Sequence, residues 1–140
     1  MRTLIGIWNS HSKGKTSTCI ELRKILLRRN PVVLFDDQKR KDFTLIVKLK
    51  RRIIAIVSKG DPGSGLAERL ANVISEWNPH VIVTTCRTRG RTSRAITTLQ
   101  GKYDVIWSST YETQVSSLQP LVNRLKARQL FNLLVKLKRL

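Results

Sequence analysis

The sequence predicts an α/β fold, a three-layer sandwich in which helices cover both faces of a mostly parallel central sheet. Two observations predict it. Short apolar runs alternate with longer stretches of helical pattern along the 140 residues. The runs also recur at regular spacing, which is typical of successive strand–helix–strand units. At this length the chain is expected to form a single core.

The expected elements begin with a strand at residues 4–8 and a helix at residues 17–29, which Asn30-Pro31 ends. Other apolar, β-rich runs predict strands at residues 32–35, 43–49, 53–57, 81–84 and 105–107. Other helical patterns predict helices at residues 66–77, 92–99 and 121–140. The short turn at residues 50–52 predicts an antiparallel hairpin. Residues 1–118 are expected to form the main domain, with residues 119–140 as a helix packed on it.

The segment from Asn9 to Thr16, NSHSKGKT, lies between the first expected strand and the first expected helix. A strand, a loop ending in Gly-Lys-Thr and a helix form the layout of a phosphate-binding loop, where backbone N–H groups and the helix N-terminus point at one place. The chain therefore resembles the P-loop nucleoside triphosphatase superfamily, and a P-loop NTPase-like fold is expected. Asn9 replaces the first glycine of the usual pattern, and asparagine is among the few other residues that tolerate a left-handed backbone.

The resemblance implies a site for ATP and Mg²⁺. The residues expected to bind the nucleotide are Asn9, Ser10, His11, Ser12, Lys13, Gly14, Lys15, Thr16 and Ser17. It also implies that Lys15 reaches the outer phosphates and that the Thr16 hydroxyl is a ligand of Mg²⁺. ATP is preferred over GTP, because neither residues 84–87 nor residues 108–111 form the Asn-Lys-x-Asp-like element of guanine-specific proteins. Trp107 and Tyr111 are expected to be buried at the end of the last strand rather than to stack on a base.

In sheets of this kind ligands bind beyond the carboxyl ends of the strands, which narrows the search for catalytic residues. Asp61 is the candidate carboxylate of the metal site, because Mg²⁺ prefers oxygen ligands. The alternative is that Asp61 belongs to an Asp-Pro-Gly turn with no ligand role. Arg87 and Arg89, in the segment RTRGRTSR, are candidates for neutralising charge on a transferred phosphoryl group. The alternatives for this segment are a nucleic-acid contact and a solvated basic loop.

Asp36 and Asp37 form a rival site. Small-molecule kinases of the same superfamily carry acidic residues after the second strand, where they orient or deprotonate an acceptor hydroxyl. Either aspartate would be the base if the protein is a kinase. The other interpretation is that the two carboxylates neutralise Lys39, Arg40 and Lys41 in the loop that follows.

The charge of the chain is strongly positive. Twenty-seven Lys and Arg residues against nine Asp and Glu residues give a net charge of +18. Such a field favours a polyanionic partner such as nucleic acid, and the alternative is a solvated basic surface. The C-terminal helix carries six basic residues and no acidic one. Its apolar pattern of Leu125, Phe131, Leu134 and Leu137 is expected to pack on the sheet, although a basic amphipathic helix also suits an anionic membrane surface or nucleic acid.

Two features of the sequence indicate the cellular compartment of the protein: its low cysteine content and its lack of long apolar runs. Cys19 and Cys86 are the two cysteines, and both are expected to be reduced core thiols. No run is long enough for a transmembrane segment, and no signal peptide precedes the first expected strand. A cytoplasmic protein is therefore expected.

Together these features predict a Mg-dependent ATP-binding protein that hydrolyses ATP. Lys15, Asp61, Arg87 and Arg89 are the expected catalytic residues, and Thr16 and Asp61 are the expected metal ligands. One alternative is a small-molecule or nucleotide kinase. Another is a basic nucleic-acid-binding module with little catalysis.

Overall fold

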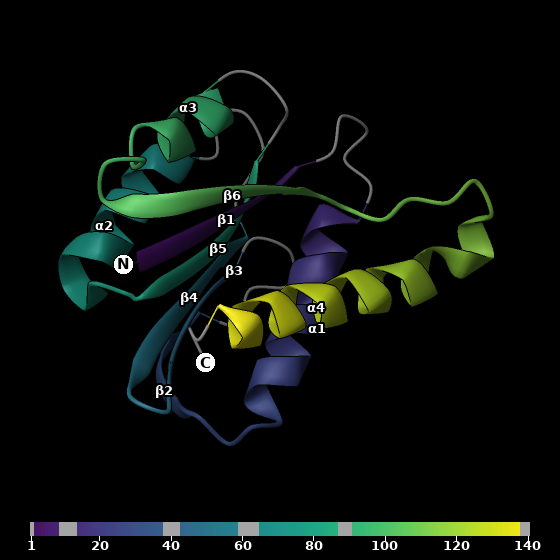
Figure 1. Ribbon diagram of the computed structural model, residues 1–140, viewed down its shortest axis with the longest axis horizontal. Coiled ribbons are helices and arrows are strands. Elements are labelled where there is room, and N and C mark those ends of the chain that lie inside the picture. The colour runs from purple at the N-terminus through teal and green to yellow at the C-terminus, as the bar shows by residue number, and fades with distance from the viewer. Residues whose placement is uncertain (1, 9–13, 38–42, 59–64, 87–90, 138–140) are drawn as a thin grey trace.

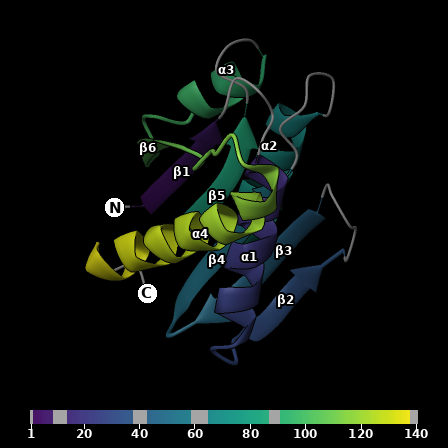
Figure 2. The same cartoon turned by 90° about the vertical axis from the view of Figure 1, so that its right-hand side faces the viewer.

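The fold is known from a computed structural model, which describes residues 2–8, 14–37, 43–58, 65–86 and 91–137. A central sheet is covered by helices on both faces (Figures 1 and 2). The strands are β1 (Arg2–Trp8), β2 (Val32–Asp36), β3 (Phe43–Leu49), β4 (Arg52–Ser58), β5 (Val81–Cys86) and β6 (Tyr103–Ser109). The α-helices are α1 (Lys15–Leu27), α2 (Leu66–Trp77), α3 (Arg91–Thr97) and α4 (Gln119–Lys136), and a 3-10 helix covers Ser116–Leu118.

The six strands lie in the order β2-β3-β4-β5-β1-β6. Strand β3 is antiparallel to both β2 and β4, whereas β4, β5, β1 and β6 are parallel to one another. The expected mostly parallel sheet and the expected antiparallel hairpin, β3–β4, are both confirmed. Strand β1 is an interior strand, because it pairs with β5 on one side and with the edge strand β6 on the other.

Two apolar cores lie on the two faces of the sheet. Helices α1 and α4 pack against each other and share the first core with residues of β1, β3, β4 and β5. Helices α2 and α3 cover the opposite face and share the second core with the side chains that point there. The layered arrangement is plain in Figure 1. Among the described helices none is long and apolar enough to cross a bilayer.

The turn between β3 and β4 is strained. The register pairs Leu49 with Arg52, so Lys50 and Arg51 are the two central residues of a tight hairpin. Their φ angles are 50° and 68°, and such turns require a positive φ at both central residues. Asn-Gly is the usual choice, because lysine and arginine disfavour the left-handed region. The local geometry therefore does not explain why two basic residues stand here.

The ends of several elements differ from the expected ends for identifiable reasons. Helix α1 begins at Lys15 because Gly14, with φ of 78°, forms its N-cap in the left-handed region. Strand β5 continues to Cys86 and β6 to Ser109, because both pair with Trp8 at the end of β1. A sequence pattern describes one segment at a time, so it does not show which residues of other strands this segment pairs with.

The buried face of α4 was only partly predicted. Phe131 and Leu134 are buried as expected, but Leu125 and Leu137 are exposed by 52% and 38%. The face toward α1 instead includes Asn123, Lys126, Ala127 and Leu130. Positions 123, 127, 130 and 134 follow one another at helical spacing, which places Leu125 on the far side of the helix. Two polar side chains thus occupy positions that an apolar pattern cannot reveal.

Candidate functional site

The parallel strands bring their carboxyl ends to one edge of the sheet. Pairing places Trp8 beside both Cys86 and Ser109, while Ser58 at the end of β4 and Asp36 at the end of β2 lie at the same edge, with β3 between these two strands. Gly14, at the start of α1, follows β1 at this edge (Figure 1). Several predicted site residues lie outside the described residues, namely Asn9, Ser10, His11, Ser12, Lys13, Asp61, Arg87 and Arg89. The described members of the predicted site are Gly14, Lys15, Thr16 and Ser17.

Lys15 is a buried lysine at the first position of α1. Its side chain is only 5% exposed. The ammonium Nζ donates a hydrogen bond to the carbonyl oxygen of Cys86 at 3.3 Å, across the gap between α1 and the end of β5. Thr16 is half-buried and Ser17 is exposed on the same first turn. The structure therefore brings a fixed ammonium group to the carboxyl ends of two central strands.

The start of α1 is suited to an anion. No acidic residue occurs in its first turn, and no side chain caps it. The first helical hydrogen bond runs from the N–H of Thr18 to the carbonyl of Gly14 at 2.8 Å. The N–H groups of Thr16 and Ser17 precede this bond and point out of the helix end with the positive end of the helix dipole.

Helix α4 contributes to the same place. A Cβ atom added at Gly14 would lie 2.7 Å from Oδ1 of Asn123 and 3.2 Å from Nε2 of Gln119. The Gln119 amide donates to Asn123 Oδ1 at 2.9 Å and to the Tyr111 carbonyl at 3.0 Å, and it accepts a bond from the Thr113 N–H at 3.3 Å. These bonds hold the first turn of α4 against the segment that follows β6, and they fix the Asn123 amide beside Gly14.

Lys126 is a second buried lysine near this edge, and it is 4% exposed. Its Nζ donates a hydrogen bond to the Ser108 hydroxyl at 2.5 Å and lies 4.9 Å from the centre of the Tyr111 ring. Burial lowers the pKa of the Lys126 ammonium below its ordinary value.

Replacing Lys126 by methionine is expected to stabilise the protein at neutral pH. A lysine whose pKa is lowered by folding opposes folding while it is charged, and this cost disappears as the pH rises through its folded pKa toward the ordinary value near 10.5. The stability gain of Lys126→Met should therefore be largest at neutral pH and shrink toward pH 10.5. Urea unfolding across this range measures it, with Lys136→Met, exposed on the same helix, as control. A gain that does not vary with pH would contradict the assignment.

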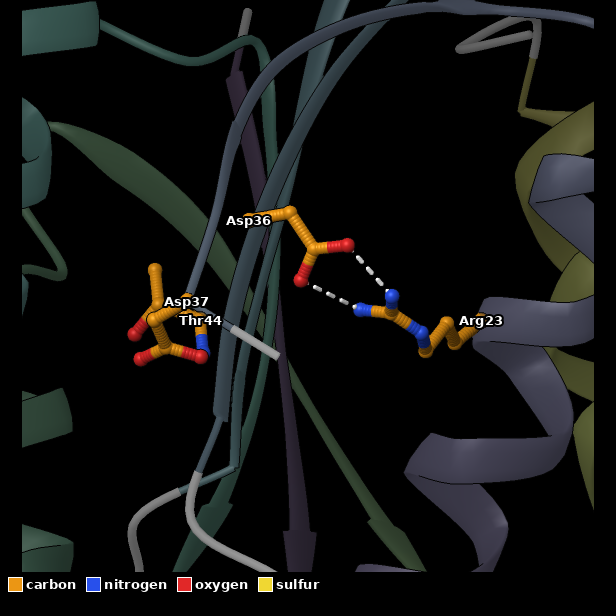
Figure 3. Close-up of polar contacts among 4 residues, drawn as sticks. All are labelled: Arg23, Asp36, Asp37 and Thr44. Carbon is orange, nitrogen blue, oxygen red and sulfur yellow. Dashed lines mark hydrogen bonds and ion pairs between the residues drawn. The ribbon is translucent and has the colours of Figure 1, made fainter. Parts of the chain in front are cut away.

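Asp36 of the rival site is engaged in a bidentate ion pair. Both of its carboxylate oxygens accept hydrogen bonds from the Arg23 guanidinium of α1, with a distance of 2.9 Å between Nη1 and Oδ1 (Figure 3). The same arginine lies 5.4 Å from the centre of the Phe43 ring, and the ion pair raises its pKa. Asp37 is turned away from this pair and accepts a bond from the Thr44 N–H at 3.1 Å. Asp36 thus connects α1 to β2.

Replacing Asp36 by asparagine is expected to lower the free energy of unfolding by about 1.5–3 kcal/mol, the usual contribution of hydrogen bonds to a charged group. The loss arises because a neutral amide cannot accept both guanidinium bonds. Asp37→Asn is the control, since an amide oxygen can still accept the bond from Thr44. Urea denaturation of the two variants measures the difference. Equal stability of both variants would show that the ion pair contributes nothing.

The two cysteines are buried and free. Burial raises the pKa of Cys19 to about 12, although a hydrogen bond with Ser58 opposes the shift. Burial also raises the pKa of Cys86 to about 11, and the nearby Lys15 ammonium opposes it. Both thiols therefore stay protonated at neutral pH and are poor nucleophiles.

The two aromatic residues expected to be buried are partly exposed. Trp107 and Tyr111 are each 39% exposed, so that expectation was wrong. Trp107 lies over the adjacent strand, where a Cβ atom at Gly6 would approach its ring to 3.1 Å. The glycine leaves room for the indole on the outer part of the sheet.

Sequence reasoning missed Arg23, Asn123 and Lys126. A polar residue at a core-facing helical position, such as Lys126, is the only signal that the sequence offers for the two α4 residues. The partner of Arg23 lies on another element, so its role needs the structure. Among the described residues no group of three His, Cys, Asp or Glu side chains could hold a metal ion, and Asp61 is outside that set.

Comparison with known proteins gives no relative. Neither a protein-family model nor a curated protein nor a solved structure matches the chain.

Proposed function

We propose that the chain is a Mg-dependent ATP-binding protein of P-loop type that hydrolyses ATP. The observation that carries the proposal is Lys15, a buried ammonium at the start of a helix, held at 3.3 Å from the Cys86 carbonyl where two central parallel strands end. Burying a charge is costly unless it gains strong partners. An ammonium forms a strong, charge-assisted hydrogen bond with a phosphate oxygen, so an outer phosphate fits this position.

The backbone around Lys15 supports the same ligand. Gly14 takes the left-handed conformation that lets the loop turn into α1, and the N–H groups of the first turn point outward. A phosphate group placed there would interact with these N–H groups, the helix dipole and the lysine at once. The first turn of α1 carries no acidic side chain that would compete with a phosphate for these N–H groups.

The metal site in this proposal combines Thr16 and Asp61. The Thr16 hydroxyl on the first turn of α1 and the Asp61 carboxylate are the hard oxygen ligands that Mg²⁺ prefers. When bound, Mg²⁺ would neutralise phosphate charge. Arg87 or Arg89 would stabilise the charge that develops on the transferred phosphoryl group. In the net reaction a water oxygen bonds to the γ-phosphorus, the bond from that phosphorus to the bridging oxygen breaks, and ADP and phosphate leave.

Hydrolysis is favoured over transfer to a small acceptor because of Asp36. A general base needs a free lone pair directed at the acceptor proton. The guanidinium of Arg23 binds both carboxylate oxygens of Asp36 and so holds this carboxylate in an ion pair between β2 and α1. The preference for ATP over GTP rests on the sequence after β5 and β6, which lacks an Asn-Lys-x-Asp-like element.

Calorimetric titration with Mg·ATP, followed by an assay of released phosphate, tests the proposal. We expect saturable binding of one nucleotide and phosphate release without an added acceptor. ADP formed only when an acceptor is supplied would instead identify a kinase. Absence of binding to both ATP and GTP would refute the proposal.

A further inference from the structure

A basic cleft lies at the edge of the sheet opposite the candidate nucleotide site. It has a volume of about 510 Å³ and is lined by Arg29, Leu49, Lys50, Phe131, Asn132 and Val135. These residues come from the end of α1, the β3–β4 turn and the last turns of α4. The end of α1 and the β3–β4 turn lie at the lower edge in both views, away from the start of α1 (Figures 1 and 2).

Three cations are held together in and beside this cleft. The guanidinium carbon of Arg29 lies 4.7 Å from the centre of the Phe131 ring, and that of Arg128 lies 5.9 Å from the same centre. Lys50 lines the cleft with Arg29. All three side chains are exposed, and in the described part of the chain none of them forms an ion pair with a carboxylate. Stacking on one ring holds two like charges near each other although they repel.

The β3–β4 turn adds an independent observation. Lys50 and Arg51 occupy left-handed positions that Asn-Gly would fill with less strain. Backbone strain of this kind lowers the stability of the folded state and concentrates at functional sites. Lys50 and Arg51 thus make the turn less stable than Asn-Gly would, and they add positive charge at and beside the cleft.

We propose that the basic cleft binds the phosphate backbone of nucleic acid. Arginine forks match phosphate oxygens, and a net charge of +18 attracts a polyanion over long range. Phe131 is 5% exposed beneath the guanidinium groups, so it is covered and does not offer a face for base stacking. The contacts are therefore made to phosphates and do not depend on base sequence.

The shape of the surface favours nucleic acid over an anionic membrane. A narrow phosphodiester strand can enter a concave cleft, whereas a flat lipid surface would contact only its rim. The cleft and Lys15 lie at opposite ends of α1, so both ligands can bind together. Nucleic-acid binding goes beyond ATP hydrolysis and does not require it.

Fluorescence anisotropy with a labelled random-sequence DNA duplex and its RNA counterpart, over a range of salt concentrations, tests the proposal. In the double variant Arg29→Gln and Arg128→Gln we expect affinity at 0.1 M salt to fall roughly tenfold or more. The slope of log K against log salt should fall by about 1.8 for the duplex DNA, because each lost phosphate contact contributes about 0.9. The control is Arg69→Gln with Lys102→Gln, which removes the same charge from α2 and from the turn between α3 and β6. An equal loss of affinity in both double variants would overturn the proposal.

A second variant separates binding from folding. Replacing Lys50 by asparagine and Arg51 by glycine gives the turn its preferred residues, so the melting temperature should rise by roughly 3–5 °C. The same variant should bind the duplex more weakly, because it loses two cations beside the cleft. Weaker binding by a more stable protein cannot come from misfolding. Unchanged binding would show that the turn takes no part.

Two further outcomes identify which proposal fails. Lys15→Ala should retain nucleic-acid binding, so failure of ATP binding alone leaves the basic cleft intact. Titration with vesicles containing phosphatidylserine examines the membrane alternative. Vesicle binding lost in the Arg29→Gln, Arg128→Gln variant, with nucleic-acid binding unchanged in that variant, would overturn the assignment to nucleic acid.

Discussion

Replacing Lys15 by alanine is expected to lower Mg·ATP affinity by roughly 10–150-fold, which corresponds to a lost charged hydrogen bond of about 1.5–3 kcal/mol. Turnover should fall further, by about 10²–10³-fold, if the ammonium also stabilises charge in the transition state. The physical reason is that this ammonium is already held at the strand ends, so the protein does not have to order it when the phosphate arrives. Calorimetry measures the first effect and phosphate release the second.

The matched control is Lys24→Ala, because Lys24 lies on the same helix but is exposed, with its ammonium paired to Glu21 at 3.4 Å. Lys15→Met retains most of the side-chain volume and shows whether a cavity rather than the lost charge causes the effect. Both variants should keep the cooperative unfolding of the parent protein. Undiminished ATP binding in Lys15→Ala and Lys15→Met would remove the central argument for the nucleotide site.

Replacing Gly14 by alanine is expected to destabilise the protein by about 2–5 kcal/mol and to weaken ATP binding. Two costs add here. A left-handed residue with a Cβ atom costs roughly 1–2 kcal/mol, and crowding in a packed region costs about 1–3 kcal/mol. The crowding arises because the new methyl group would lie 2.7 Å from Asn123 Oδ1, so either the Asn123 side chain, which the Gln119 amide holds by a hydrogen bond, or the backbone at Gly14 must shift.

Gly65 offers a closely matched control. It forms the N-cap of α2 with φ of 77°, almost the value of 78° at Gly14, and a Cβ atom there meets nothing within 4 Å. Gly65→Ala should therefore show the backbone cost alone. Asn123→Ala in the Gly14→Ala background should recover part of the crowding cost, with a coupling energy of about 0.5–3 kcal/mol in a double-mutant cycle. Equal destabilisation by the two alanine substitutions would mean that α4 does not press on Gly14.

Local patterns predicted many of the elements correctly. Helix α2 covers the predicted residues 66–77, because Leu66, Leu70 and Val73 form an apolar stripe at helical spacing and Asn78 ends it in a left-handed conformation. The hairpin followed from two β-rich runs with a short basic turn between them. In both cases the residues that determine the element lie close together in the chain, so the element could be predicted from a single sequence.

Interactions between distant segments were beyond the reach of the same reasoning. Nothing local indicates that β5 lies between β4 and β1, or that Asn123 faces Gly14. The partner of Asp36 was expected among the basic residues that follow it, but Arg23 of α1 binds both of its carboxylate oxygens. The position of Lys15 at a loop-to-helix junction could be predicted, because the residue pattern of such a junction is itself local.

Strand β1 lies inside the sheet, and its position affects how the chain folds during synthesis. Residues 2–8 are synthesised before the other five strands of this sheet, yet their hydrogen-bond partners are residues 81–86 and 103–109. At a ribosomal rate of 5–20 residues per second, β1 waits roughly 4–16 s between its own synthesis and that of β5. During this time its apolar side chains have no sheet to enter, so a nascent chain is most prone to aggregation before β5 emerges. Slow, chaperone-assisted completion is the expected course, since sheets built from such distant pairings close late.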